Sequence, residues 1–437
     1  MIGAARREEI ISALRRGTVP NAGLDALAVG LGGLAPALDA ELDAVATGRA
    51  GFKAIRGEYG SGKTFFGRWL QERARARGFA TSEVQINETE TPLHRLETVY
   101  RRLVERLGTS DTPGGAFRSI IDGWFFALEQ DVLADGRTDA SDMAALLERT
   151  NELMEARLAL ISRSAPAFSA VLRAYRKALS EGNVQLADGL ISWLAGQPNV
   201  AAGIKRAAGV KGDLDHFTAT NFLVGLLTIM RDSGFAGLLL VLDEVETLQR
   251  MRADTREKGL NALRQWIDEI DAGRFPGLYL VITGTPAFYD GPQGVQRLAP
   301  LAQRLHVDFA TDSQFDNPRA VQIRLQPFNH SALVEVGRRV RDIFATGQSS
   351  EVRLRRLADD AYVDTLATAV AGGLGGKVGV APRLFLKKLV GDVLDRVDLY
   401  ENFNPRQNYK LTLADTEMTV NERAASGASS IDDIELP

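Results

Sequence analysis

The chain has 437 residues, of which 45% are hydrophobic and 25% charged, and its formal net charge is −4. This composition provides a core of ordinary size and no overall charge that would attract a polyanion. The chain has no cysteine, which excludes disulfides, thiol catalysis and cysteine zinc sites. Its four histidines lack metal-ligand spacing and no apolar run could span a bilayer, so we expect a cytoplasmic protein without membrane contact.

The first half of the chain alternates between helical and strand patterns. Residues 1–50 predict a helical segment that packs on a nucleotide-binding domain. The stretch FKAIRG (52–57) predicts a strand, and it leads through a glycine-rich loop into a helix over 65–78. A second strand is predicted at TSEVQIN (81–87) and a helix over 93–108. No strand pattern occurs from about 112 to 212, which predicts a helical insertion.

The second half adds three strands and a helical end. Two continuous apolar runs, GLLLVLDE (237–244) and GLYLVITGTP (277–286), are typical of strands buried on both faces of a parallel sheet. VQIRLQPF (321–328) predicts a third strand. We therefore expect an α/β core over 51–330 and a helical domain over 331–400. The remaining residues, 401–437, lose periodicity and are predicted to be a partly disordered tail.

The stretch GEYGSGKT fits G-x-x-x-x-G-K-[ST] between a predicted strand and a predicted helix. Such a loop surrounds nucleotide phosphates with backbone N–H groups, and the following helix directs its positive end toward them. Lys63 is predicted to contact the β- and γ-phosphates, and the Thr64 hydroxyl to bind Mg²⁺. A chance match is the alternative. The predicted ATP-binding residues of the loop are Gly57, Glu58, Tyr59, Gly60, Ser61, Gly62, Lys63, Thr64 and Phe65.

Hydrolysis of ATP also needs a magnesium carboxylate and a group that activates water. Asp243, at the end of a buried strand, is predicted to hold Mg²⁺, and Glu244 to act as the base; the alternative is an acidic pair that merely ends a strand. Thr283 or Thr285 would lie near the γ-phosphate, unless this is an ordinary strand exit. Two arginines, Arg304 and Arg383, would stabilise charge, although either one taken alone is an ordinary surface residue.

The motifs GEYGSGKT, LLLVLDE, VITGTP, PLAQR and VAPR occur in the order of Walker A, Walker B, sensor 1, arginine finger and sensor 2 of the AAA+ ATPases. The chain resembles their origin-recognition branch. More narrowly, ALRRGTVPNAGLDALAVG, FKAIRGEYGSGKTFFGRWLQERA and VQINETETPLHRLETVYRRL resemble the BrxD-like ATP-binding proteins of BREX phage-defence systems. The resemblance covers most of residues 5–400.

The resemblance implies a fold and a set of roles. It implies the sheet order 5-1-4-3-2, a C-terminal lid, and an ATP–Mg²⁺ site in a homo-oligomer or a hetero-oligomer with other defence proteins. For the nucleotide, it implies phosphate and Mg²⁺ binding by Lys63 and Thr64, Mg²⁺ binding by Asp243, and a position near adenine for Val29 and Gly30. For hydrolysis, it implies that Glu244 is the catalytic base and that Thr283 or Thr285 is sensor 1. It also implies that Arg304 is the trans-acting finger and that Arg383 is sensor 2. The insertion is longer than an AAA+ core needs.

Three functions remain open at this point. The first is an ATPase in phage defence that couples hydrolysis to DNA or to a partner protein. The second is a nucleotide-gated scaffold with little turnover, and the third, which lacks an acceptor-binding lid, is a P-loop kinase. Duplex DNA also stays open as a partner, because basic residues of the helical end could form one face. The roughly 37 residues after Tyr400 are too few for a winged-helix module, which argues against sequence-specific duplex binding. The basic residues of the helical end (Arg353, Arg355, Arg356, Lys377, Lys387, Lys388) alternate with aspartates.

Overall fold

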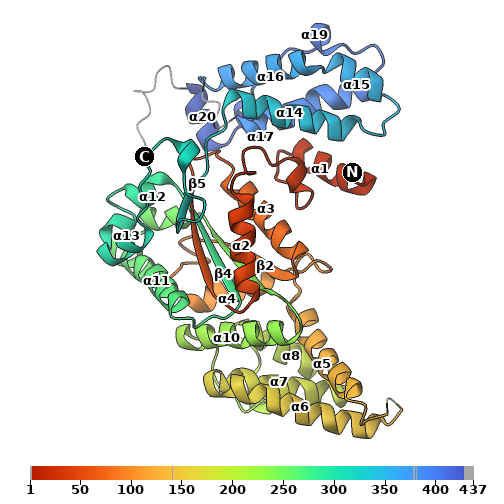
Figure 1. The fold of residues 1–437 in the computed structure, drawn as a ribbon, viewed down its shortest axis with the longest axis vertical. Helices are drawn as coiled ribbons and strands as arrows, with labels where there is room; N and C mark the ends of the chain where they lie inside the picture. The colour runs from red at the N-terminus through yellow and green to blue at the C-terminus, as the bar shows by residue number, and fades with distance from the viewer. Residues whose placement is uncertain (1, 140, 377–378, 380, 428–437) are drawn as a thin grey trace. The chain divides into compact units, whose positions relative to one another are not determined.

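Five strands form one parallel sheet in the computed structural model, which describes residues 2–139, 141–376, 379 and 381–427 (Figure 1). The strands are β1 (Gly51–Arg56), β2 (Phe79–Gln85), β3 (Gly237–Asp243), β4 (Leu278–Gly284) and β5 (Gln322–Arg324). Their order is β2-β3-β4-β1-β5, which is the sequence of neighbours 5-1-4-3-2 read from the opposite edge. The α/β class expected from the sequence is confirmed.

The two apolar runs form the centre of the sheet because both faces of β3 and β4 are covered. Every residue of these two strands is buried. In the parallel pairing of β2 with β3, Phe79 lies opposite Gly237 and Gln85 lies opposite Asp243. This register brings the polar residues that end β2 and β3 next to each other at the carboxyl edge of the sheet.

Helices connect the strands. Those between and after the strands are α2 (Ala35–Ala46), α3 (Lys63–Ala76), α4 (Leu96–Arg106), α10 (His216–Asp232), α11 (Ala253–Asp271), α12 (Pro286–Asp290) and α13 (Ala299–Leu305). Short 3-10 turns are η1 (Leu24–Ala26), η2 (Val245–Arg250), η3 (Val295–Arg297) and η4 (Ser313–Phe315). No helix among the described residues is both long enough and apolar enough to cross a membrane.

The helical insertion lies between α4 and α10. Its helices are α5 (Phe117–Ala134), α6 (Met143–Ser164), α7 (Pro166–Ser180), α8 (Val184–Leu194) and α9 (Ala202–Ala207). Capping residues set two of the starts, because the Asp142 and Asn183 side chains accept backbone N–H groups of α6 and α8. The insertion therefore falls within the range expected from the absence of strand patterns.

The C-terminal part is helical. Its elements are α14 (His330–Ala345), α15 (Glu351–Leu357), α16 (Asp360–Gly373), α17 (Pro382–Lys387), the π-helical η6 (Lys388–Leu394), α18 (Asp395–Leu399), α19 (Pro405–Asn408), η7 (Asp415–Glu417) and α20 (Val420–Gly427). The tail predicted to start at Glu401 therefore contains three short helices. The rest of that prediction falls on residues 428–437, outside the described part.

Contacts divide the chain into two compact units. One unit is Met1–Leu38, Ile55–Glu72 and Val307–Pro437, and the other is Asp39–Ala54 and Arg73–His306. In the first unit, α1 (Ala4–Arg15) packs against α14, α17 and η6. The first helix thus shares a core with the C-terminal helices, and the packing of residues 1–50 as a whole on the nucleotide domain stays a prediction. The second unit contains β2, β3, β4 and the helical insertion.

Candidate functional site

The glycine loop after β1 has the geometry that phosphate binding requires. Gly60 and Gly62 have φ angles of +82° and +87°, in the left-handed region that favours glycine. A Cβ atom on Gly57 would lie 2.3 Å from the Ser61 hydroxyl, so a larger residue would not fit there. The buried Ser61 Oγ has no hydrogen-bond partner among the described residues. A tight loop with a buried, unpaired hydroxyl fits a polar ligand at this position.

Lys63 lies at the start of α3 and is held by its own loop. Its ammonium group donates to the carbonyl oxygens of Gly57 at 2.8 Å and Glu58 at 3.3 Å. The Tyr59 ring lies 5.1 Å from the same ammonium, within cation–π range. The sequence predicts that Lys63 contacts nucleotide phosphates, and that contact stays a prediction. Thr64 follows within the first turn of α3.

Contacts with η1 fix the helix that follows the loop. The Glu72 carboxylate accepts the backbone N–H groups of Gly23 and Leu24, and the Trp69 indole donates to Asp25 at 2.6 Å. These contacts hold the segment before the predicted adenine residues against α3.

Apolar packing joins the predicted adenine segment and the start of α3 to the C-terminal helices of the same unit. Val29, from the predicted adenine segment, and Phe65, next to Thr64, both pack against the apolar cluster built by α1, α14, α16 and α17. Gly30 is exposed, with a φ angle of +77°. The structure therefore places Val29 and Phe65 on one apolar cluster, a connection that separate motifs could not reveal.

The end of β3 places the acidic pair in two different environments. Asp243 is 6% exposed, and it accepts hydrogen bonds from the Thr283 hydroxyl and from the Glu244 backbone N–H. The Glu244 N–H also lies 3.3 Å from the Thr283 hydroxyl. Glu244 itself is exposed and has a φ angle of +59°, which costs energy for a residue with a side chain. The backbone thus turns sharply so that the two carboxylates face different surroundings.

Of the two candidate threonines, Thr283 is the one that touches the acidic pair. Thr285 is also buried, and it precedes α12 without a side-chain cap hydrogen bond. Thr283 is therefore the stronger candidate for the polar residue between β4 and the acidic pair.

Gln85 is a site residue that the sequence analysis did not identify. Its amide donates to the Glu244 carboxylate at 2.7 Å, with Gln85 at the last position of β2. The signal was the alternation of TSEVQIN, which places a polar residue at the end of a strand. Only the strand order shows that this end lies beside β3.

Arg304 lies on α13, and in this chain its partner is an aspartate of α11. Its guanidinium is 2.6 Å from the Asp268 carboxylate, and it also donates to the Pro300 carbonyl. Asp268 also accepts from Arg264, one turn earlier on its own helix. The side chain of Arg304 is about one third exposed, so the pair lies at the surface.

Arg383 is paired with the C-terminal segment. Its guanidinium donates to both carboxylate oxygens of Glu422, with Nε–Oε1 at 3.0 Å, and to the Glu417 carbonyl at 2.6 Å. Glu422 is 3% exposed. The predicted sensor arginine therefore already has a bidentate anionic partner within the chain.

The basic residues of the helical end are also paired with acidic groups. Lys387 and Lys388 both contact the Glu417 carboxylate, at 3.4 and 2.7 Å. Burial opposes ionisation of Glu417, but the two lysines hold its pKa below its ordinary value. Burial likewise opposes the charge on Lys388, yet Glu417 and Asp392 raise the pKa of this lysine.

Of the remaining basic residues of this face that the structure describes, Arg356 is exposed and makes no ion pair with a described residue, whereas the others are paired. Arg355 pairs with Asp342 and Glu351, and Arg353 donates to the carbonyls of Val397 and Asp398. Lys377 falls outside the described residues. The described part of this face therefore has a mixed charge, which does not favour binding to a phosphate backbone.

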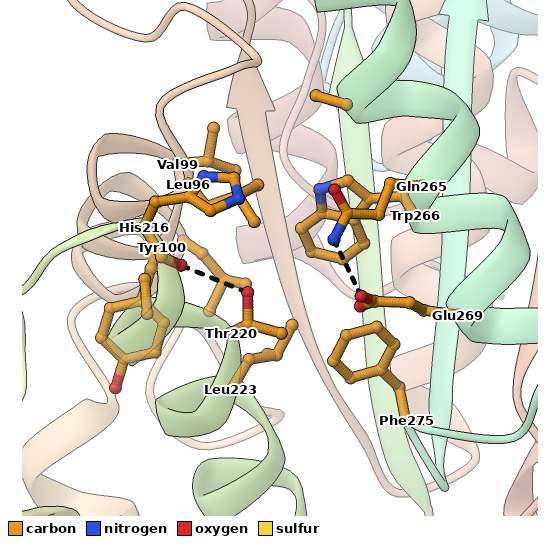
Figure 2. Close-up of a pocket in the computed structure, with 13 residues that line it drawn as sticks. Leu96, Val99, Tyr100, His216, Thr220, Leu223, Gln265, Trp266, Glu269 and Phe275 are labelled. Atoms are coloured by element: carbon orange, nitrogen blue, oxygen red, sulfur yellow. Dashed lines mark hydrogen bonds between the residues drawn. The ribbon is translucent and has the colours of Figure 1, made fainter.

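An apolar cavity lies elsewhere, between α4, α10 and α11 (Figure 2). In Figure 2, Gln265 donates to Glu269, and the Thr220 hydroxyl donates to the His216 carbonyl. The buried indole nitrogen of Trp266 has no hydrogen-bond partner among the described residues. No lysine or arginine lines this cavity, so it does not suit a phosphate.

A parallel sheet whose first strand leads through a glycine loop and a lysine into a helix defines a P-loop nucleotide-binding protein. The family described as BREX system ATP-binding protein BrxC/D matches residues 2–413, and the chain belongs to this family. No curated protein and no solved structure matches the chain. The predicted BrxD-like resemblance is confirmed, and with it an ATP-binding family of a phage-defence system.

Proposed function

We propose that this protein is an AAA+ ATPase that binds and hydrolyses ATP–Mg²⁺ and couples the cycle to DNA or to a partner protein in a BREX-type defence system. The observation that carries the proposal is the contrast between the two carboxylates at the end of β3. Asp243 is buried and hydrogen-bonded, whereas Glu244 is exposed. Two carboxylates in different environments suit two different roles.

The roles follow from what each side chain can do. The loop N–H groups and Lys63 bind the phosphates, while Thr64 and Asp243 hold Mg²⁺, which neutralises charge on the phosphates. Glu244 takes the proton of the attacking water. Thr283 positions Asp243, and the helices from His330 to Leu399 form a lid.

A nucleotide-gated scaffold with little turnover is the second candidate. The contact between Gln85 and Glu244 favours it, because an amide that donates to the carboxylate weakens its action as a base. In this version ATP binding drives assembly, and hydrolysis is slow.

Steady-state ATP hydrolysis over a range of protein concentrations, with and without duplex DNA, separates the two candidates. Glu244→Gln serves as the blank and Lys63→Ala as the binding-deficient control. Specific activity that rises with concentration indicates a site completed between subunits, and stimulation by DNA identifies the effector. A rate equal to that of the blank at every concentration, with ATP still bound, contradicts the ATPase and leaves the scaffold.

A further inference from the structure

The C-terminal segment of residues 415–427 contacts Arg383, the residue for which the sequence predicts the sensor 2 role. Arg383 makes a two-oxygen contact with Glu422 and donates to the carbonyl of Glu417. A guanidinium and a carboxylate match in geometry, so this is among the stronger polar contacts a protein makes. The segment and the arginine belong to the same compact unit as the phosphate loop.

A capping box folds the segment against Arg383. Thr419 and Glu422 have the spacing of Thr-x-x-Glu, the backbone N–H of Thr419 donates to Glu422 at 2.6 Å, and the Thr419 hydroxyl accepts the Glu422 N–H at 3.3 Å. Glu422 therefore has two tasks: it caps α20 and it neutralises Arg383. A helix of eight residues is marginal by itself, so its order depends on such contacts.

Apolar and ionic contacts around the capping box complete the attachment. Met418 is buried in the apolar cluster of the C-terminal helices, and Leu411 and Leu413 pack against it. Glu417 accepts from Lys387 and Lys388 on the helix that Arg383 begins. The segment is thus a distinct element attached at one basic edge of that helix.

A phosphate oxygen presents to a guanidinium the same chemistry as a carboxylate oxygen. Both carry negative charge and can present two oxygens to a guanidinium. Arg383 already uses Nε and Nη2 for Glu422 and Nη2 also for the Glu417 carbonyl, so a two-oxygen contact with a phosphate requires at least one of these hydrogen bonds to break. Arg383 retains about one third of its side-chain exposure, which leaves it accessible from solvent. Phe65 beside the phosphate loop and Leu384 beside Arg383 pack on the same apolar cluster, so the two helix starts share one core.

We propose that the segment 415–427 is an internal competitor of ATP, in which the Glu422 carboxylate occupies Arg383 until a nucleotide phosphate displaces it. This inference rests on the proposed function, because it takes Arg383 to be a phosphate ligand. Once Arg383 turns away, Glu422 is a buried carboxylate without its cation, and such a charge is strongly unfavourable. The whole segment therefore detaches when nucleotide binds, and this detachment signals at the C-terminal end that the site is occupied.

Competition of this kind is reciprocal. If ATP weakens the attachment of the segment, then weakening the attachment must strengthen ATP binding by the same factor. Glu422→Gln removes the charge that holds Arg383, and it keeps the capping box because glutamine serves at that position. Glu401→Gln is the matched control, since Glu401 is 94% exposed and does not touch Arg383.

The test titrates the full-length chain with a fluorescent, non-hydrolysable ATP analogue and Mg²⁺. We expect Glu422→Gln to bind about tenfold more tightly than the unchanged protein, within the usual range of coupling between sites, and Glu401→Gln to bind equally. Hydrogen–deuterium exchange of the unchanged protein provides a second measurement. The analogue should accelerate exchange in residues 415–427, and it should not do so in Lys63→Ala.

The outcomes separate this inference from the proposed function. No analogue binding to any variant contradicts the proposed function. Binding that depends on Lys63, with equal or weaker affinity in Glu422→Gln and unchanged exchange in 415–427, overturns the competitor and leaves the ATP site intact. If Glu422→Gln does not fold, exchange in the unchanged protein decides: acceleration on nucleotide binding supports the competitor, and no acceleration overturns it.

Discussion

The amide of Gln85 donates a hydrogen bond of 2.7 Å to the carboxylate of Glu244, which joins the end of β2 to the residue that follows β3. A carboxylate that accepts from an amide is a weaker base and is aimed at the amide. We therefore expect Gln85→Ala to raise basal ATP turnover by roughly three- to tenfold, in line with the loss of one exposed hydrogen bond of about 1 kcal/mol.

The control for this change is Gln265→Ala. Gln265 also donates from its amide to a glutamate, Glu269 at 3.0 Å, but on the exposed side of α11. Initial rates of phosphate release at saturating ATP provide the measurement. Turnover that falls in Gln85→Ala and not in Gln265→Ala would show instead that Gln85 positions Glu244 for catalysis.

The phosphate loop yields a prediction based on space. A Cβ on Gly57 would meet the Ser61 hydroxyl at 2.3 Å and the Ser61 Cβ at 3.3 Å. We expect Gly57→Ala to weaken ATP binding by roughly five- to 150-fold, because Ser61 or the loop must shift to relieve the overlap, at a cost of about 1–3 kcal/mol. The double variant Gly57→Ala/Ser61→Ala removes the nearer of the two atoms.

Isothermal titration with ATP measures both variants, and thermal melting verifies that they fold. The double variant should recover part of the affinity, whereas Ser61→Ala alone should stay within a few fold of the unchanged protein. If the double variant binds no better than Gly57→Ala, the loop tolerates no Cβ at position 57 for a reason other than Ser61.

The sequence predicted the elements that depend on residues close together in the chain. The glycine loop, the buried strand that ends at Asp243 and the helical insertion follow from residue types and spacing. Periodicity distinguishes buried strands from amphipathic helices without any knowledge of tertiary contacts. For the same reason the strand order was available only through the family resemblance, since periodicity does not specify which strands are neighbours.

Contacts between distant segments were out of reach of the sequence. Gln85 is separated from Glu244 by 159 positions and Arg383 from Glu422 by 39. The sequence analysis did not identify the capping box at Thr419, and the loss of periodicity after residue 400 predicted a partly disordered tail. The basic edge of the preceding helix holds residues up to 427 in place. Composition alone does not show that the end of the chain has such a partner.

The contact between Thr283 and Asp243 distinguishes the two candidate threonines. Thr283→Val keeps the shape and removes the hydroxyl that donates to the buried carboxylate. We expect it to lower the free energy of unfolding by about 1–3 kcal/mol, as is usual when a buried group loses its partner, and to lower turnover at limiting Mg²⁺. Thr285→Val is the matched control.

Urea denaturation and Mg²⁺ titrations of ATP hydrolysis test this pair. Thr285 is equally buried but has no cap hydrogen bond, so its valine variant should change Mg²⁺ dependence little. The reverse result, with Mg²⁺ dependence altered only in Thr285→Val, would assign the polar role after β4 to Thr285 and reduce Thr283 to a structural contact.

The pairing of Arg304 with Asp268 bears on whether this arginine acts on a neighbouring subunit. An arginine that stabilises transition-state charge is worth about a thousandfold or more in turnover, so Arg304→Ala should lose nearly all activity. If it acts in trans, mixing Arg304→Ala with Glu244→Gln should restore part of the activity. The first variant then supplies an intact site, and the second supplies the arginine.

Asp268→Asn removes one partner of Arg304 at the surface, and we expect it to leave turnover within a few fold of the unchanged protein. Mixtures that stay inactive at every ratio, together with a loss of activity in Asp268→Asn, would make the pair a structural link between α11 and α13.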